Sequence, residues 1–394
     1  MNKIVGVIRA QCGCWLSLTA SPLRSCLCIF VVFFGPAIAF AQGAGSTSVA
    51  PTPVSMADMR KNVAAASGRA LSWEGPQSGP AGAEGKTLAV ISDDLRNGGI
   101  LGVAQGIQEA TKVLKWSVKI FDAGGTATGR NKASQDALAS HPDGLVVVGA
   151  DAQVMQPLLV PFATQGIPVV GWHVSPQAGR VANSVVATNV STNPLEVARI
   201  TAMAAVSSAK GPAGVVIFTD SNFEIAMAKA NAMAEVIRAC KECVLLEIRD
   251  VAISRNAELM PTVTRDLLAR FGQQWTHALA INDIYFDFAV PELIKAGQSS
   301  RRINLMSAGD GSAAAFMRIQ AKSFQTATVA EPLNQQGWQL VDELNRLIQH
   351  QPLSGYVSPV HLVTSDNIAF DGGARFQYDP DNGYRDAYRS IWKR

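Results

Sequence analysis

From Lys86 onward, short apolar runs alternate with longer segments of helical periodicity, and this alternation constrains the fold more than any other feature. Continuous apolar runs are typical of parallel strands buried on both faces. The segment between the first two runs places Ile100, Val103 and Ile107 on one helical stripe. Repeated strand–helix–strand order implies parallel sheets with right-handed crossovers. The predicted strands are Leu88–Ser92, Val118–Phe121, Leu145–Val148, Ile167–Gly171, Val215–Phe218, Val244–Ile248, Ala278–Ile281, Ile303–Ser307 and Thr326–Val329.

These strands are too many for a single compact sheet, and the strand–helix series is interrupted near the middle of the chain and then begins again. After the fourth strand, Asn193 and Pro194 fit the N-cap and first position of a helix. A new strand–helix series begins after Lys210-Gly211-Pro212. We therefore predict an α/β fold of two doubly wound parallel-sheet lobes. Ligands bind such sheets beyond the carboxyl ends of the strands, so two facing lobes would share a cleft.

The first 41 residues have the organisation of an export signal. Three basic residues accompany an apolar run from Leu27 to Ala39, and Ala39-Phe40-Ala41 gives a small-x-small cleavage pattern. The run is shorter than the roughly 20 apolar residues of a spanning helix. We predict a cleaved signal peptide over residues 1–41 and a periplasmic location, with a retained anchor as the alternative.

Removing residues 1–41 leaves a chain that is close to electrically neutral. The segment holds three of the 34 basic residues and none of the 31 acidic ones. Clustered Lys and Arg mark nucleic-acid surfaces and polybasic membrane patches. The balance therefore argues against both kinds of partner.

Four of the six cysteines lie within the first 41 residues, and Cys240 and Cys243 remain. In an oxidising compartment, a disulfide closing this small loop is the simplest interpretation. Free thiols, a redox pair or half of a zinc site are the alternatives. No second Cys or His pair stands at zinc-ligand spacing in the sequence, so we expect no metal.

Both flanks of the strand-rich region have a different character. Residues 42–85 are rich in Ala, Gly, Ser and Pro, and we interpret them as a flexible N-terminal extension with one short helix from Asp58 to Ala66. Residues 371–394 form a tail in which aromatic residues alternate with charges, either packed on a lobe or marking a partner surface.

Motifs of common enzyme classes are missing from the sequence. Gly98-Gly99-Ile100-Leu101-Gly102 follows a predicted strand but lacks the Gly-x-Gly-x-x-Gly order of dinucleotide sites. There is no phosphate-binding loop motif and no Gly-x-Ser-x-Gly elbow. We therefore expect no cofactor and no enzymatic activity.

The order of several short motifs resembles one known family. Pro142-Asp143-Gly144 introduces the third strand, Gly166-Ile167-Pro168 introduces the fourth, and Asn282-Asp283 and Gly309-Asp310-Gly311 follow two later strands. From about Lys86 to Asn367 the chain is similar to the type I periplasmic binding proteins, the ribose- and galactose-binding group. They share their fold with the effector domains of lac-repressor-like regulators, but residues 1–85 contain no basic DNA-binding headpiece.

The resemblance implies three crossings between lobes, near Ala187–Asn189, near Glu331-Pro332 and near Tyr356–Val360. Such hinges permit rigid-body closure over a ligand. The implied N-terminal lobe consists of residues 86–188 plus 332–356. The implied C-terminal lobe consists of residues 189–331 plus 357–370.

The family also implies a function. The chain is expected to be a monomeric substrate-binding component of an ABC-type importer, delivering a sugar or sugar-like solute to a membrane permease. A periplasmic sensor that presents its bound state to a membrane receptor or kinase is the alternative.

Polar residues at the strand ends are the first binding candidates. Asp310 and Asn282 stand where the family's ligand-contacting Asp and Asn occur, with turn formation as the alternative role. Asp283 is expected to cap the following helix. Asp94 and Asn97, with Asp93, lie in the loop after the first strand, where ligand contact and helix capping are both open.

Other positions depart from the family pattern. Trp172 and His173 replace an Asp-Arg pair, and strand alternation predicts that only one of them faces the cleft. Lys229 replaces an Arg, Glu331 replaces a Gln, and Phe223 lies in a loop that would reach the cleft. Because Lys lacks the planar fork of Arg, these changes favour a larger or amine-bearing compound over a plain pentose.

Overall fold

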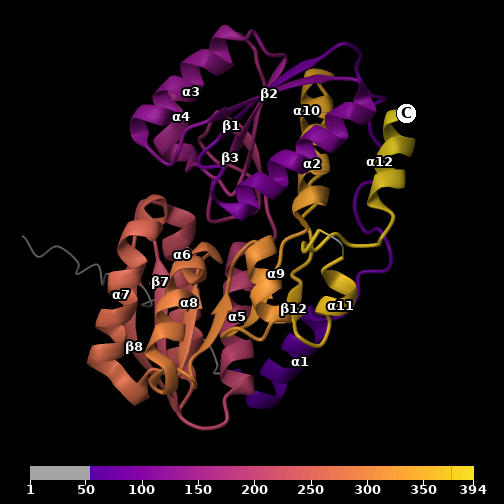
Figure 1. The fold of residues 1–394 in the computed structure, drawn as a ribbon. Helices are drawn as coiled ribbons and strands as arrows, with labels where there is room; N and C mark the ends of the chain where they lie inside the picture. The colour runs from indigo at the N-terminus through magenta and orange to yellow at the C-terminus, as the bar shows by residue number, and fades with distance from the viewer. Residues whose placement is uncertain (1–53, 374) are drawn as a thin grey trace, which may run out of the picture. The chain divides into compact units, whose positions relative to one another are not determined.

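The computed structural model describes residues 54–373 and 375–394 and arranges them in two α/β lobes (Figure 1). The predicted signal peptide over residues 1–41 lies outside the described residues. No helix among the described residues is both long and apolar enough to span a bilayer.

The first lobe is built on a six-stranded sheet with the order β2-β1-β3-β4-β6-β5. All neighbours are parallel except β5 and β6. Its strands are β1 (Thr87–Ser92), β2 (Ser117–Asp122), β3 (Gly144–Val148), β4 (Val169–Trp172), β5 (Gly179–Arg180) and β6 (Val186–Val190). Its helices are α2 (Gly98–Leu114), α3 (Ala127–Ala139), α4 (Ala152–Thr164), α10 (Leu333–Ile348) and α12 (Tyr384–Trp392).

The second lobe repeats this arrangement with the order β12-β11-β10-β9-β7-β8. Only the β11–β12 pair is antiparallel. Its strands are β7 (Ala213–Thr219), β8 (Cys243–Asp250), β9 (His277–Ala280), β10 (Asn304–Ser307), β11 (Gln325–Val329) and β12 (Leu362–Thr364). Its helices are α1 (Met56–Ala66), α5 (Pro194–Ser208), α6 (Glu224–Ala239), α7 (Asn256–Phe271), α8 (Ile284–Ala296), α9 (Ala313–Gln320) and α11 (Ile368–Asp371).

The predicted fold class is confirmed, and every predicted strand overlaps an observed one. Alternate residues of β1 enter different cores, since Leu88 and Val90 pack on the side of α2 while Ala89 and Ile91 pack on the side of α4. This two-sided burial explains the continuous apolar runs. The unpredicted strands β5, β6 and β12 are short or carry polar residues, so they give no apolar run.

Within the described residues, the chain passes between the lobes after β6, between β11 and α10, and between α10 and β12, and it passes between them twice more, from α1 to β1 and from α11 to α12. Helix α10 therefore belongs to the first lobe although it comes late in the chain, and Figure 1 shows it beside α2. A Cβ on Gly337 would lie 2.6 Å from the backbone of Gly106, so these two helices approach backbone to backbone. The exact residues expected to bound the lobes, 86–188 plus 332–356 and 189–331 plus 357–370, remain predictions.

The interpretation of residues 42–85 as a flexible extension does not hold for residues 54–85. Met59 of α1 is buried in the core of the second lobe. Farther along, the Ala83 amide donates to Asn345 at 3.0 Å, and the Trp116 indole donates to the Ala83 carbonyl at 2.7 Å. Ala- and Gly-rich composition here permits close packing against α10 rather than mobility.

Most aromatic residues of the tail pack inward, and Phe376 is the exposed exception. Tyr384, Tyr388 and Trp392 are buried along one face of α12. Trp392 stacks on Trp338 of α10 with ring centroids 5.4 Å apart. Of the two expected roles for this tail, the structure shows packing.

Candidate functional site

The carboxyl ends of strands from both sheets border one small pocket. Its volume is about 60 Å³, which is room for about four to six water molecules. Eight of the nine predicted ligand-binding residues line it; Glu331 is not among the lining residues. The eight are Asp94, Asn97, Trp172, His173, Phe223, Lys229, Asn282 and Asp310.

Trp172 and His173 both line the pocket, so the expectation that only one would face it is wrong. Strand β4 ends at Trp172, and His173 adopts the left-handed region with φ 54°. This break in strand geometry folds the imidazole over the indole, with centroids 3.7 Å apart and planes 8° from parallel. The indole N–H donates to Gln336 Oε1 at 2.7 Å, which fixes the stack from α10.

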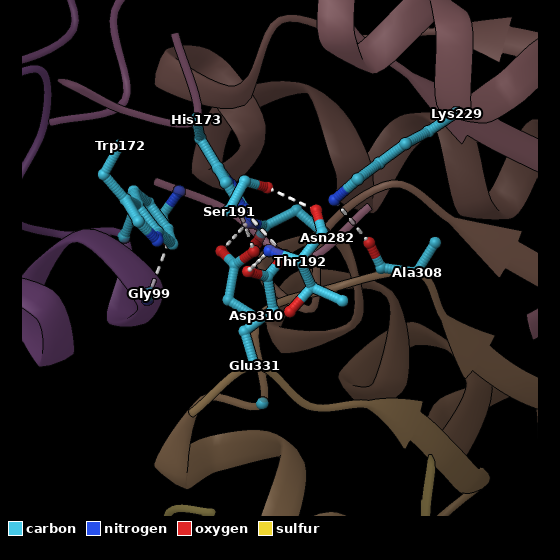
Figure 2. A network of polar contacts seen from close by, with 12 residues as sticks. Gly99, Trp172, His173, Ser191, Thr192, Lys229, Asn282, Ala308, Asp310 and Glu331 are labelled. Carbon is cyan, nitrogen blue, oxygen red and sulfur yellow. Dashed lines mark hydrogen bonds and ion pairs between the residues drawn. The ribbon is translucent and has the colours of Figure 1, made fainter. Parts of the chain in front are cut away.

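Glu331 lies behind His173 and holds it. Its Oε1 is 2.7 Å from His173 Nε2, and its Oε2 accepts from the Thr192 amide at 3.0 Å and from Gln336 Nε2 at 2.7 Å (Figure 2). Burial alone would raise the pKa of Glu331, but the charge and hydrogen bond of His173 lower it to about 2. Glu331 is 1% exposed and fully engaged, so it positions His173 from outside the pocket.

The same network joins the segments that cross between the lobes. Thr192 follows β6, Glu331 follows β11, and Ser358 precedes β12. Thr192 Oγ1 and Ser358 Oγ are 2.9 Å apart, and Gln336 Nε2 donates to Ser358 Oγ at 3.1 Å. Hydrogen bonds therefore connect His173, through Glu331 and Gln336, to the three crossings after β6, after β11 and before β12.

Asp310 lines the pocket and has one buried carboxylate oxygen without a hydrogen-bond partner among the described residues. Its Oδ2 accepts from Asn282 Nδ2 at 2.7 Å. Its Oδ1 is buried and has no hydrogen-bond partner within residues 54–373 and 375–394, and His173 Nδ1 lies 3.6 Å away. Burial raises the pKa of Asp310, although His173 and Lys229 oppose that shift. A buried acceptor without a partner is costly, so this oxygen favours a ligand that donates to it.

Asp283 occupies the N-cap position of α8, as expected, but its side chain makes no capping hydrogen bond there. Its Oδ2 accepts from the amides of Gly311 at 2.8 Å and Ser312 at 3.1 Å, and its Oδ1 accepts from Thr328 at 3.0 Å. The cap of α8 comes instead from Asn282 Oδ1, which accepts from the Ile284 amide. Asp283 therefore holds the loop that carries Asp310, a role that only the folded loop reveals.

Lys229 places a buried ammonium group beside these acceptors. Its Nζ donates to the Ala308 carbonyl at 2.9 Å, and Figure 2 shows this end of the side chain directed toward Asn282 and Ala308. An ammonium has three N–H donors. No other hydrogen bond of this Nζ is found in the described part of the chain, so two donors remain for the pocket.

The carboxylates after β1 already have arginine partners. Asp94 accepts from Arg96, and Asp93 pairs with Arg130 through two contacts of 2.5 and 3.1 Å. Asn97 caps α2 by accepting from the Gly99 amide at 3.0 Å while it also lines the pocket. Burial raises the pKa of Asp93 despite Arg130.

Sequence reasoning missed Arg130, which reaches the site from α3. Its guanidinium lies 5.8 Å from the centroid of the Phe223 ring, which belongs to the second lobe. Arg130 is 37 residues from Asp93 and has no motif around it, so no local signal could have identified it.

Glycines at the start of α2 let the lobes approach each other. A Cβ on Gly99 would lie 2.1 Å from Asp310 Oδ2, and a Cβ on Gly98 would lie 2.7 Å from Ser312 Cβ. The Gly98-Gly99 pair thus serves close contact between lobes, which explains why no aromatic residue stands there.

The comparison with known families decides the identity. The family of the periplasmic binding protein domain matches residues 88–352. The chain belongs to this family. Its members are ligand binders rather than enzymes. A search of curated protein sequences finds no match.

Solved structures resemble this periplasmic binding protein over most of its length. The first is an ABC transporter solute-binding protein from Agrobacterium vitis with bound allitol (TM-score 0.62, 20% identity, covering 73% of this chain and 97% of that one). Another, from Mycobacterium smegmatis with bound glycerol, has TM-score 0.64 and 17% identity and covers 75% and 100%. The XylFII–LytSN complex has TM-score 0.61 and 13% identity and covers 72% and 100%. These identities show a shared fold.

Two further predictions concern sulfur and metal chemistry. Cys240 and Cys243 form a disulfide between α6 and β8, as the simplest interpretation predicted. His173, Asp310 and Glu331 place ligand atoms within 4.8 Å of one another, the geometry of a possible metal site. An ion there would have to displace the hydrogen bond between His173 and Glu331.

Proposed function

We propose that this periplasmic binding protein is the substrate-binding component of an ABC-type importer, and that it closes its two lobes around a sugar or sugar-like solute. Asp310 Oδ1 carries the proposal, because it is a buried acceptor without a partner in the described residues and it belongs to a side chain that lines a pocket between residues of both lobes. The solved relatives with allitol and glycerol support a polyhydroxyl ligand.

Each pocket residue has a role in this proposal. Asp310 accepts a ligand hydroxyl, and Lys229 and Asn97 donate to ligand oxygens. Trp172 and Phe223 offer apolar faces, and His173 contacts the ligand from the stack that Glu331 holds. Asn282 and Asp94 shape the site. The protein acts as a binder without catalysis, as a monomer, after export by the signal peptide of residues 1–41.

Closure follows from the connections between lobes. Residues 86–188 plus 332–356 move against residues 189–331 plus 357–370, and the network around Glu331 joins three of the segments that cross between the lobes. A ligand seated against His173 and Asp310 contacts both lobes at once, so binding favours the closed arrangement.

Native mass spectrometry of protein purified from periplasm tests the proposal directly, because a retained ligand can be identified by mass. A thermal-shift panel of sugars and polyols is the second measurement. A ligand at a hundred times its Kd should stabilise the protein by about 2.7 kcal/mol. Retention of a ligand without hydroxyl groups, and no shift with any sugar or polyol, would contradict the proposal.

A sensor is the second candidate, since one solved relative is the XylFII–LytSN complex. Deleting the gene and measuring both labelled-ligand uptake and ligand-induced transcription separates the two functions. Loss of uptake supports transport, whereas loss of the transcriptional response with normal uptake supports sensing.

A further inference from the structure

The pocket has a polar end and an apolar end, and they follow the strand order of the second sheet. Asn282 and Asp310 follow β9 and β10. Ile225 of α6 follows β7, and Ile253 follows β8. Because the order is β10-β9-β7-β8, Asn282 and Asp310 lie toward β10, whereas Ile225 and Ile253 lie toward β7 and β8. Lys229 of α6 belongs to the polar side because its Nζ donates to the Ala308 carbonyl after β10, and Ile281 is the one aliphatic lining residue that follows β9. The aliphatic lining residues are Ile100, Ile225, Ala226, Ile253 and Ile281.

The groups free to bind a ligand are few and lie at the polar end. Asp310 Oδ1 is an unsatisfied acceptor, and Lys229 Nζ has two donors beyond its bond to Ala308. At the apolar end, the carboxylates of Asp93 and Asp94 are already paired with Arg130 and Arg96. A ligand edge that packs on Ile225, Ala226 and Ile253 meets no polar side chain among these three residues, so a hydroxyl directed at them would lose its water partners without gaining new ones.

Resting on the proposed function, we infer that the site selects a compact, uncharged polyol or sugar with hydroxyls along one edge and a deoxygenated, methyl-like opposite edge. The hydroxyl edge bridges Asp310 Oδ1 and Lys229 Nζ. The deoxygenated edge packs on Ile225 and Ile253. A pocket with room for about four to six water molecules accepts a monosaccharide or a smaller polyol and excludes an oligosaccharide.

The buried ammonium of Lys229 also decides the ligand's charge. A ligand amine at the polar end would meet Asp310, but it would equally meet Lys229, which is buried and has no carboxylate hydrogen bond within the described residues. Like charges at close range in a poorly solvated site repel strongly. The structure therefore favours a neutral ligand over the amine-bearing compound expected from the sequence.

The test compares pairs of ligands that differ by one oxygen atom, using isothermal titration calorimetry. The pairs are propane-1,2-diol with glycerol, 5-deoxy-D-ribose with D-ribose, and L-fucose with L-galactose. We expect the deoxy member of the best-binding pair to bind at least tenfold more tightly. Tighter binding of the fully hydroxylated member in every pair that binds would overturn the inference while leaving the proposed function intact.

Binding of none of the six compounds, with a retained native ligand that lacks hydroxyls, would overturn both proposals. Ile253→Asn supplies a partner for a hydroxyl at the apolar end, so it should reduce the preference for the deoxy member at least threefold. Glu258→Gln, on the exposed first turn of α7, is the matched control and should leave the ratio unchanged.

A second set of calorimetric titrations tests the charge of the ligand. In the wild type, 1-aminopropan-2-ol should bind at least tenfold more weakly than propane-1,2-diol. Lys229→Met keeps the length of the buried side chain without its charge, so it should remove most of that difference. Tighter binding of the amine by the wild type would overturn the assignment of an uncharged ligand.

Discussion

The charged groups at the two ends of the pocket are arranged in different ways. We call the polar end of the pocket the hinge end, because Glu331 there is hydrogen-bonded to segments that cross between the lobes. His173, Asp310 and Glu331 are buried at this end. We call the opposite, apolar end the mouth. There, Asp93 and Asp94 pair with arginines of their own lobe. Among the described residues that line the pocket, only Asp310 at the hinge end has a buried carboxylate oxygen without a hydrogen-bond partner.

This difference assigns different tasks to the two ends. A buried, partly unsatisfied network is sensitive to the loss of any member, because the remaining groups cannot turn to water. The carboxylates of Asp93 and Asp94 are also buried, but each is already compensated by an arginine, so they contribute less to ligand affinity than the unsatisfied oxygen of Asp310. Substitutions at the hinge end should therefore change the dissociation constant more than substitutions at the mouth.

Asp310→Ala gives the largest expected effect. It removes the acceptor for the ligand hydroxyl, and a hydrogen bond to a charged group contributes about 1.5–3 kcal/mol. Affinity for the best ligand should fall about 100-fold by calorimetry, with an unchanged circular dichroism spectrum. Asp310→Asn keeps the shape and should lose less. Binding within threefold of the wild type would remove Asp310 from the site.

Gly99→Ala tests closure without altering any polar group. The new Cβ would lie 2.1 Å from Asp310 Oδ2, so the lobes could not approach as closely. Affinity should fall about tenfold or more, which is at least about 1.4 kcal/mol, and the ligand-induced decrease in radius of gyration by X-ray scattering should shrink. A Cβ on Gly211 meets nothing within 4 Å, so Gly211→Ala is the control. Full closure of Gly99→Ala would show that this contact does not limit the lobes.

Glu331→Gln addresses the group that holds His173. The carboxylate accepts from Thr192 and Gln336, and an amide has only one acceptor oxygen for them. We expect affinity to fall about fivefold, and the free energy of unfolding at pH 7 to fall by about 1–3 kcal/mol. Calorimetry and urea unfolding measure the two effects. An unaltered affinity would mean that His173 keeps its position without Glu331.

The pH dependence of the same variant separates charge from packing. The pKa of Glu331 is lowered to about 2 in the folded protein, below the ordinary 4.5. Its contribution is therefore complete above pH 4.5 and is lost as the pH falls toward 2. The stability difference between wild type and Glu331→Gln should shrink from pH 6 to pH 3. A difference that stays constant over this range would assign the loss to packing.

The sequence predicted the parts of the molecule that depend on local pattern. Continuous apolar runs located the strands, and residues just after those runs, such as Asn282 and Asp310, line the pocket. Features that depend on folded geometry were missed or wrong. His173 leaves strand geometry through a left-handed residue, and Asp283 binds a loop from the next strand connection. Ala- and Gly-rich residues before β1 looked mobile because their partners on α10 lie about 260 residues away.

Arg130→Ala tests the mouth and gives the smallest expected effect. The guanidinium lies across from Phe223 of the other lobe, and this cation–π contact contributes about 0.5–1 kcal/mol. Loss of the buried pair with Asp93 should lower the stability of the first lobe, which is measured separately by urea unfolding. Ligand release measured by stopped-flow fluorescence should accelerate about two- to fivefold, with little change in the association rate. Arg96→Ala is the matched control, since its side chain is 65% exposed and its contacts with Asp94 and the Gly124 carbonyl stay within the first lobe. A loss of affinity as large as that of Asp310→Ala would show that the mouth also determines ligand affinity, and the contrast between the two ends would fail.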